Sequence, residues 1–287
     1  PNYLHLVPNK KIHHDYRIDI CYHSKGSVAL KIAITGKGGV GKTTLAAGFA
    51  NLFAKRGFKV YAVDADPDIS LGTTLGATEE ALKAQPPLVE MRDLIKERTG
   101  AQGGFFVLNP KVDDVLDKYS IDMGNIKLLR MGAYKNAGSS CYCPENAFLN
   151  AIVNSLLLDK QDVVILDFGA GIEHLTRGTA RGVDLMLIVT EPTKVSVDTV
   201  KVIQKLSAEM EISNVKVVGN KVRTEKEKSF LTESFAPEDF LGILHYNEEL
   251  WEKSMMDDPR GMEDVLVDSV SSLFDGIIDE GGEIKKG

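Results

Sequence analysis

Long apolar runs, cysteines and excess positive charge are all scarce in this sequence. The densest apolar run, LMLIV at residues 185–189, is far shorter than the about 20 residues that a membrane-spanning helix needs. Three cysteines in 287 residues are too few for a disulfide framework. The net charge of −7 argues against a surface that neutralises nucleic-acid phosphates or anionic lipid. We therefore expect a cytoplasmic protein with reduced thiols and no nucleic-acid or membrane partner.

The first 27 residues differ in character from the rest of the chain. They hold four of the six histidines, together with Cys21, and show no clear hydrophobic period. They also lack the arrangement of a secretory signal. A histidine-rich segment could collect metal ions, but clustered histidine is a weak compositional signal. We expect an N-terminal extension, non-native or disordered, over residues 1–27, and a single domain over residues 28–287.

From residue 28 onward, short β-branched runs alternate with longer helical patterns. The runs expected to form strands are residues 28–35, 59–66, 126–131, 163–167, 184–190, 215–220 and 240–244. Helical patterns lie between them, for example at residues 42–56 and 195–210. This order predicts an α/β fold with a doubly wound, mostly parallel sheet and helices on both faces. Ligands of such a fold bind at the carboxyl ends of the strands.

The first expected strand leads into GKGGVGKTT, which satisfies the pattern G-x-x-x-x-G-K-[ST] of a P-loop. The backbone N–H groups of such a loop point inward around phosphate oxygens. Lys42 adds a positive charge, and Thr43 offers a hydroxyl to Mg²⁺. We therefore expect a nucleoside triphosphate to bind this loop. The expected contacts are Gly36, Lys37, Gly38, Gly39, Val40, Gly41, Lys42, Thr43 and Thr44.

The same glycines also fit G-x-G-x-x-G, the phosphate-binding turn of a dinucleotide-binding dehydrogenase. Asp64 or Asp66 stands about where the ribose-binding acid of that fold would lie. However, the Lys42–Thr43 pair has no function on a pyrophosphate. Asp167, which ends a second apolar strand, fits a carboxylate that holds Mg²⁺ through water. We favour the triphosphate, and the alternative predicts NAD(P)H binding.

The segment KGGVGKT resembles the deviant Walker A motif of the MinD/ParA/nitrogenase-iron-protein class of ATPases. The resemblance implies ATP as the ligand, with ADP and phosphate as products. It also implies that the additional lysine, Lys37, reaches across a homodimer to the partner's nucleotide. There it would neutralise charge on the leaving phosphate. The alternative for Lys37 is a solvated loop lysine.

Further segments match the same class in chain order. Asp66 in DADPD matches the aspartate that orients or deprotonates the attacking water, although it could also cap the next helix. DFGAGIEHL looks like the second switch, with Asp167 on Mg²⁺ and Gly171 near the γ-phosphate. Asn220 and Lys221 end a strand where this class places an adenine-reading asparagine, although Asn is also an ordinary turn residue. The implied catalytic residues are Lys37, Lys42 and Asp66.

The run SSCYCPENAF places Cys141 and Cys143 directly before a helical pattern over residues 144–159. Pro144 suits a first helical turn, and the positive end of the helix dipole favours thiolate. Two sulfurs are half of a closed metal site, so a symmetric dimer could supply four, for Zn²⁺ or Ni²⁺. An iron–sulfur cluster, a redox pair or two indifferent buried cysteines stay open.

Five segments together are similar to the CooC family of ATPases, which mature the nickel site of carbon monoxide dehydrogenase. They are GKGGVGKTT, DADPD, NPKVDD, CYCPENA and DFGAGIEHLTRGTA, and the similarity spans essentially residues 28–250. It implies a metallochaperone whose homodimer, promoted by nucleotide and metal, binds Ni²⁺ or Zn²⁺ through paired Cys141 and Cys143. It further implies ATP-dependent nickel insertion into apo carbon monoxide dehydrogenase.

Two positions depart from the family pattern. His245 stands where this class commonly has a proline beside the adenine, which puts the base pocket in question. Gly169 stands where an acidic residue is expected, which could alter the coupling between nucleotide and metal. Two further functions stay open, an iron-protein-like iron–sulfur carrier or reductase and a MinD/ParA-type positioning ATPase.

Overall fold

The computed structural model describes most of the chain from Leu30 onward. The described ranges are residues 30–100, 105–132, 144–158, 163–170, 182–255, 262–274 and 276–277. The expected extension over residues 1–27 lies outside them, as do three predicted site residues, Cys141, Cys143 and Gly171.

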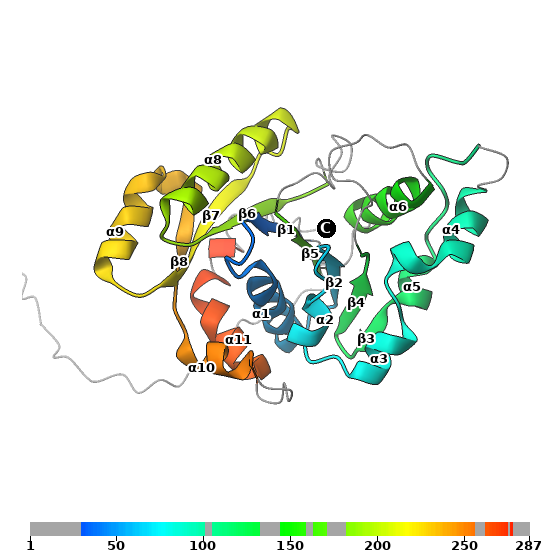
Figure 1. Cartoon of the computed structure of the whole chain (residues 1–287), viewed down its shortest axis with the longest axis horizontal. Coiled ribbons are helices and arrows are strands. Elements are labelled where there is room, and N and C mark those ends of the chain that lie inside the picture. The colour runs from blue at the N-terminus through cyan, green and yellow to red at the C-terminus, as the bar shows by residue number, and fades with distance from the viewer. Residues whose placement is uncertain are drawn as a thin grey trace, which may run out of the picture.

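An eight-stranded sheet runs through the molecule in the order β3-β4-β2-β5-β1-β6-β7-β8 (Figure 1). The strands are β1 Leu30–Gly36, β2 Val60–Ala65, β3 Ile121–Met123, β4 Ile126–Arg130, β5 Val163–Phe168, β6 Leu185–Thr190, β7 Val215–Val222 and β8 Phe240–His245. Neighbouring strands are parallel except β3 and β4, which are antiparallel. The predicted α/β fold with a mostly parallel sheet is confirmed.

Helices cover both faces of this sheet. They are α1 Lys42–Lys55, α2 Leu71–Thr74, α3 Glu79–Ala84, α4 Arg92–Thr99, α5 Val115–Tyr119, α6 Pro144–Leu158, α8 Lys194–Glu209, α9 Glu225–Ser234, α10 Glu248–Lys253 and α11 Met262–Val270. Short 3₁₀ turns occupy Leu88–Glu90, Pro237–Asp239 and Ser271–Leu273. In Figure 1, α9 and β8 lie at one end of the sheet, and α3, α4 and α5 lie at the other.

The core is divided between the two faces by the alternation of side chains along each strand. In β1, Ile32 and Ile34 join α1 and α11 in one apolar cluster, while Ala33 joins α6 and α8 in the other. β1, β5 and β6 are buried along their whole length. This burial explains why their sequences are mostly apolar, as expected for strands covered on both faces.

The sheet order fixes where a ligand can bind. β1 lies between β5 and β6, and the chain crosses from one side of β1 to the other between those two strands. In a doubly wound sheet, the crevice at such a reversal receives the ligand, outside the carboxyl ends of the strands. The P-loop follows β1 at this point.

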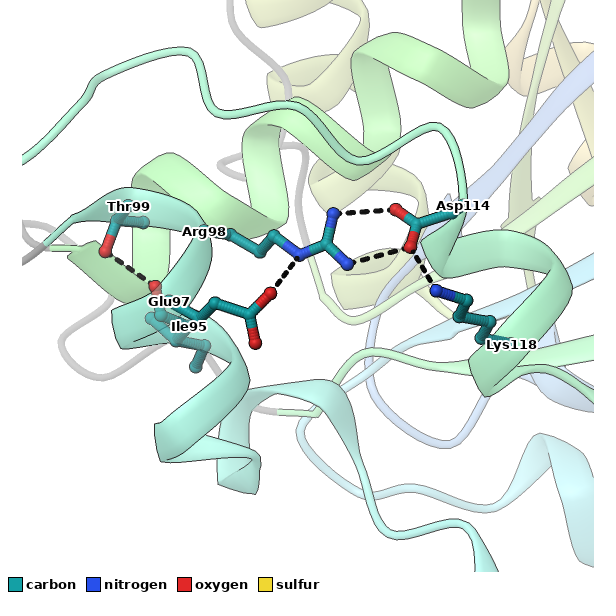
Figure 2. Close-up of polar contacts among 6 residues, drawn as sticks. All are labelled: Ile95, Glu97, Arg98, Thr99, Asp114 and Lys118. Carbon is teal, nitrogen blue, oxygen red and sulfur yellow. Dashed lines mark hydrogen bonds and ion pairs between the residues drawn. The ribbon is translucent and has the colours of Figure 1, made fainter.

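Part of the segment NPKVDD has a structural function. Asp114, its last residue, accepts two hydrogen bonds from the Arg98 guanidinium, at 2.7 and 2.8 Å, and one from Lys118 Nζ at 2.8 Å (Figure 2). Arg98 and Lys118 hold the pKa of the Asp114 carboxyl well below its usual range. These contacts join α4 to α5, and α4 packs against α6.

Candidate nucleotide-binding site

The phosphate loop joins β1 to α1 and packs closely on neighbouring strand ends. Gly36 has a φ of 146°, and a Cβ there would clash with the carbonyl oxygen of Val189 on β6. Gly41 has a φ of 96°, and a Cβ there would clash with the Asn220 amide on β7. Both positions therefore require glycine, for the backbone conformation and for the close approach.

Two consecutive side chains at the end of β7 hold the rim of this loop. Asn220 Nδ2 donates to the carbonyl oxygen of Val40 at 2.8 Å, and Lys221 Nζ donates to that of Gly39 at 2.6 Å. Lys221 has a φ of 59°, which is costly for a residue with a side chain and is typical of functional sites. Asn220 was predicted as the base contact, and Lys221 as a nucleotide-binding residue. The structure places them on the loop, and the base contact stays a prediction.

Lys42 points its ammonium group into the loop. Its Nζ lies 3.4 Å from the carbonyl oxygen of Lys37 and 3.9 Å from Asp66 Oδ2, with the side chain 7% exposed. Such long contacts leave a buried cation only partly compensated, which suits an incoming phosphate. The structure thus brings two predicted catalytic residues, Lys42 and Asp66, to one place.

Two carboxylates lie buried beneath the loop, at the ends of adjacent strands. Asp64 on β2 and Asp167 on β5 are register partners, and both are fully buried. Asp64 Oδ2 accepts the Leu71 N–H at 2.9 Å. Among the described residues, Asp64 Oδ1 and both oxygens of Asp167 have no hydrogen-bond partner. Sequence reasoning named Asp64 only as a possible ribose ligand and missed this pairing.

Burial changes the proton affinity of both carboxylates. Loss of solvation raises the pKa of Asp167 to about 7 and that of Asp64 to about 6. The Thr43 hydroxyl opposes part of the rise in the pKa of Asp167, and the Leu71 N–H opposes part of the rise in the pKa of Asp64. The positive charges of Lys42, near Asp167, and of Arg130, near Asp64, also oppose the rise in pKa, but burial remains the largest cause for both carboxylates.

These residues fit a magnesium ion. Mg²⁺ binds oxygen ligands, usually one or two carboxylates together with nucleotide phosphates. Partnerless oxygens of Asp167, beside the hydroxyl of Thr43, offer that chemistry. A second hydroxyl-bearing residue, Ser70, lies beside Thr43, with 3.5 Å between the two hydroxyl oxygens. Asp167 and Thr43 would hold the ion next to the phosphate loop.

The segment DADPD, which holds Asp66, lies close to the start of the segment DFGAGIEHL, which holds Gly169. Asp66 Oδ1 accepts the Asp68 N–H at 2.9 Å. A Cβ on Gly169 would lie 3.2 Å from Pro67 Cδ and 3.6 Å from Asp66 Oδ2. An acidic side chain at position 169 would therefore bring a second carboxylate against Asp66. The glycine leaves Asp66 facing Lys42, which explains how the departure from the family pattern is accommodated.

A cleft of about 670 Å³ extends from this loop, within the usual size for small-molecule sites. Its phosphate end is lined by Gly38, Gly39, Gly41, Lys42, Thr43, Thr44, Asp66 and Lys221. Its far end lies between β8, α10 and α11 and includes His245, Tyr246, Asn247, Leu250, Trp251 and Met262. His245 is thus a cleft residue, as its position in the sequence predicted. The aromatic contribution of α10 was missed, because a single Trp after a strand carries no motif.

The described ranges do not test the predicted thiolate metal site. Within them, no three His, Cys, Asp or Glu residues cluster as a metal site would require. Cys141 and Cys143 lie outside, so their role stays a prediction. No helix in the described part of the chain has the length and apolar character to cross a membrane.

Comparison with known proteins agrees with this geometry. Residues 31–259 match the CobQ/CobB/MinD/ParA nucleotide-binding domain. An uncharacterized ATP-binding protein of Methanocaldococcus jannaschii is 43% identical over 87% of this chain and 98% of its own length. The carbon monoxide dehydrogenase accessory protein CooC of Rhodospirillum rubrum is 39% identical over 76% and 84%. MinD from Pyrococcus horikoshii, solved with Mg-ADP, shares the fold, with a TM-score of 0.59 and 17% identity over 91% and 100%.

Proposed function

The chain belongs to the CobQ/CobB/MinD/ParA nucleotide-binding family, and we propose that it is a homodimeric, cytoplasmic ATPase that delivers nickel to an enzyme. The phosphate loop above the partnerless carboxylate of Asp167 is the observation that carries the ATPase assignment. The relationship to CooC supports the choice of cargo, with apo carbon monoxide dehydrogenase as the client.

In this proposal the phosphate loop binds the nucleotide, and residues at the strand ends hold Mg²⁺ and the attacking water. Loop N–H groups and Lys42 bind the phosphates, and Mg²⁺ held by Asp167 and Thr43 neutralises charge as it develops on them. Asp66, 3.9 Å from Lys42 Nζ, orients or deprotonates the attacking water. Gly169 lies so close to Pro67 and Asp66 that a Cβ there would be 3.2 Å from Pro67 Cδ, so phosphate release would change both segments.

Lys37 acts on the nucleotide of the partner subunit. Gly38 and Gly39 line the cleft of their own chain, but Lys37 is not among the described residues that line it. Its carbonyl oxygen faces Lys42 within its own chain. This arrangement supports a side chain that serves another nucleotide when two subunits close on ATP.

Nickel binds Cys141 and Cys143 of both subunits. β4 is parallel to β2, so it ends at Arg130 on the sheet edge that carries the phosphate loop. The chain enters α6 at Pro144, and this helix is packed in the core through residues such as Ile152. The two cysteines lie between these points in the sequence. ATP binding would set the distance between the two pairs of thiolates, and release of the ion would follow hydrolysis.

The cross-dimer arrangement can be tested by mixing two inactive variants. Lys37→Ala lacks the lysine that serves the partner, and Asp66→Asn lacks its own water-orienting carboxylate. In a mixed dimer, the Lys37→Ala subunit keeps Asp66 and receives Lys37 from the other chain. A one-to-one mixture should recover about a quarter of wild-type turnover, because half the dimers are mixed and each has one complete site. Absence of recovery, with mixed dimers verified, would reject the cross-dimer role.

A second candidate function uses the same two thiols. The chain is also similar to proteins named iron–sulfur cluster carrier protein in two Pyrococcus species. In that case four cysteines of a dimer would hold a cluster instead of nickel. Anaerobically purified protein would then show visible absorption and labile sulfide, and nickel binding would compete with the cluster.

A further inference from the structure

The far end of the cleft has a different chemistry from the phosphate end. Tyr246, Leu250, Trp251 and Met262 give it an aromatic and apolar surface, beside the polar side chains of His245 and Asn247. Trp251 is the single tryptophan of the sequence, and 53% of it is exposed. A large aromatic side chain exposed in a cleft wall, at the end away from the charged loop, points to a flat apolar partner.

The helix that carries Trp251 is held in place on both sides. Asn247 caps α10 by accepting the Leu250 N–H at 3.0 Å, and the Tyr246 N–H donates to the Val222 carbonyl oxygen at 2.9 Å. The Arg223 guanidinium lies 4.2 Å from the centre of the Tyr246 ring. Because Arg223 already occupies one face of Tyr246, Trp251 is the more available aromatic surface in this wall.

We propose that Trp251 stacks against the nucleobase of the bound nucleotide. This inference rests on the proposed function, since the phosphate loop must hold the other end of the same molecule. The base faces the indole while the phosphates bind the loop, and stacking uses the π-face that every base presents. Trp251 therefore contributes affinity for the nucleoside part of the ligand and little discrimination among purines.

The test compares a ligand that has a base with one that lacks it. Binding of ADP and of inorganic tripolyphosphate is measured by calorimetry for the wild type, Trp251→Ala and Trp251→Phe. Trp251→Ala should raise the Kd for ADP about tenfold and leave the Kd for tripolyphosphate unchanged. Trp251→Phe should recover most of the affinity. Met255→Ala is the matched control, because Met255 is 61% exposed beyond the same helix and does not line the cleft.

Tryptophan fluorescence, excited selectively over the tyrosines, gives an independent readout, because Trp251 is the single tryptophan of the chain. Saturation with ADP should change that emission, whereas tripolyphosphate should leave it nearly unchanged. Equal ADP affinity in the wild type and Trp251→Ala would overturn the inference. So would an equal loss for both ligands, which indicates a folding defect, or unchanged emission at saturating ADP. A wild type that binds neither ligand would instead overturn the proposed function, and this inference with it.

Discussion

In the phosphate loop the carbonyl oxygens of Gly39 and Val40 each accept a side-chain hydrogen bond, whereas beneath it both oxygens of Asp167 lack a partner among the described residues. The loop is thus held in its anion-binding form before any ligand arrives. The buried carboxylates, by contrast, keep oxygens without a hydrogen-bond partner, and binding of a proton or a cation would compensate their charge. Folding alone therefore forms the part of the site that binds the phosphates. The buried carboxylates that would bind the cation instead lower the stability of the folded protein when no cation is present.

In the phosphate loop, the largest loss of folding stability is expected at a glycine whose backbone conformation and surroundings exclude a side chain. Gly36→Ala forces a Cβ against the Val189 carbonyl oxygen at a φ of 146°. We expect the free energy of unfolding in urea to fall by about 3 kcal/mol. In Gly38→Ala no atom lies within 4 Å of the new Cβ, so the change should stay within about 0.5 kcal/mol. Equal losses in both variants would show that the loop is not packed as described.

The carboxylate half should reveal its cost as a dependence of stability on pH. The pKa of Asp167 is raised from 3.8 to about 7, so the folded state holds this proton more tightly than the unfolded chain. Stability without Mg²⁺ and nucleotide should therefore be full below pH about 4, fall as pH rises through 7, and then level off. Asp167→Asn should be more stable than the wild type at pH 8, by about 2 kcal/mol.

Two controls sharpen this comparison. Asp93→Asn removes an exposed carboxylate on α4 and should follow the wild-type pH profile. Mg²⁺ with ADP should reduce the difference between the wild type and Asp167→Asn, because a bound cation compensates the buried charge. The account fails if wild-type stability rises between pH 5 and pH 8, or if Asp167→Asn keeps the wild-type slope.

The smallest effect on nucleotide affinity is expected for the exposed hydrogen bond between Lys221 and the phosphate loop. Lys221→Met keeps the aliphatic stem and removes the hydrogen bond to the Gly39 carbonyl oxygen. Because this contact is exposed, its loss should raise the Kd for ADP only about fivefold, near 1 kcal/mol. Lys221→Arg should retain most of the affinity. Lys226→Met, on the exposed side of α9, should leave the Kd unchanged. An equal rise in the Kd for ADP in Lys226→Met would show that the loss of positive charge, and not of the hydrogen bond to Gly39, weakens binding.

The sequence was sufficient for features that leave a local pattern. Continuous apolar runs predicted each long strand to within a residue or two, and the glycine spacing located the loop. The pattern over residues 262–278 indicated one continuous helix, but α11 stops at Val270 and the chain continues as a 3₁₀ turn. The edge strand β3 was missed, because three residues are too few to show a period of two.

Contacts between distant residues could not be predicted in the same way. Asn220 and Val40 are 180 positions apart, and the residue types alone did not indicate that the amide would hold the loop carbonyl. Asp64 likewise became meaningful only when the sheet register placed it beside Asp167. Such pairings depend on strand order, which is set by packing of the whole sheet and not by any one segment.

The central claim is that ATP brings four thiolates from two subunits around one nickel ion. The most direct measurement is Ni²⁺ binding and stoichiometry in the presence of Mg²⁺ and a nonhydrolysable ATP analogue, with the oligomeric state followed in parallel. Wild type and the Cys21→Ala control should bind one Ni²⁺ per two chains, more tightly with the analogue than without it. Cys141→Ala/Cys143→Ala should lose this site while remaining able to bind nucleotide. Equal Ni²⁺ affinity in the double variant and the wild type, or one Ni²⁺ per single chain, would contradict the account.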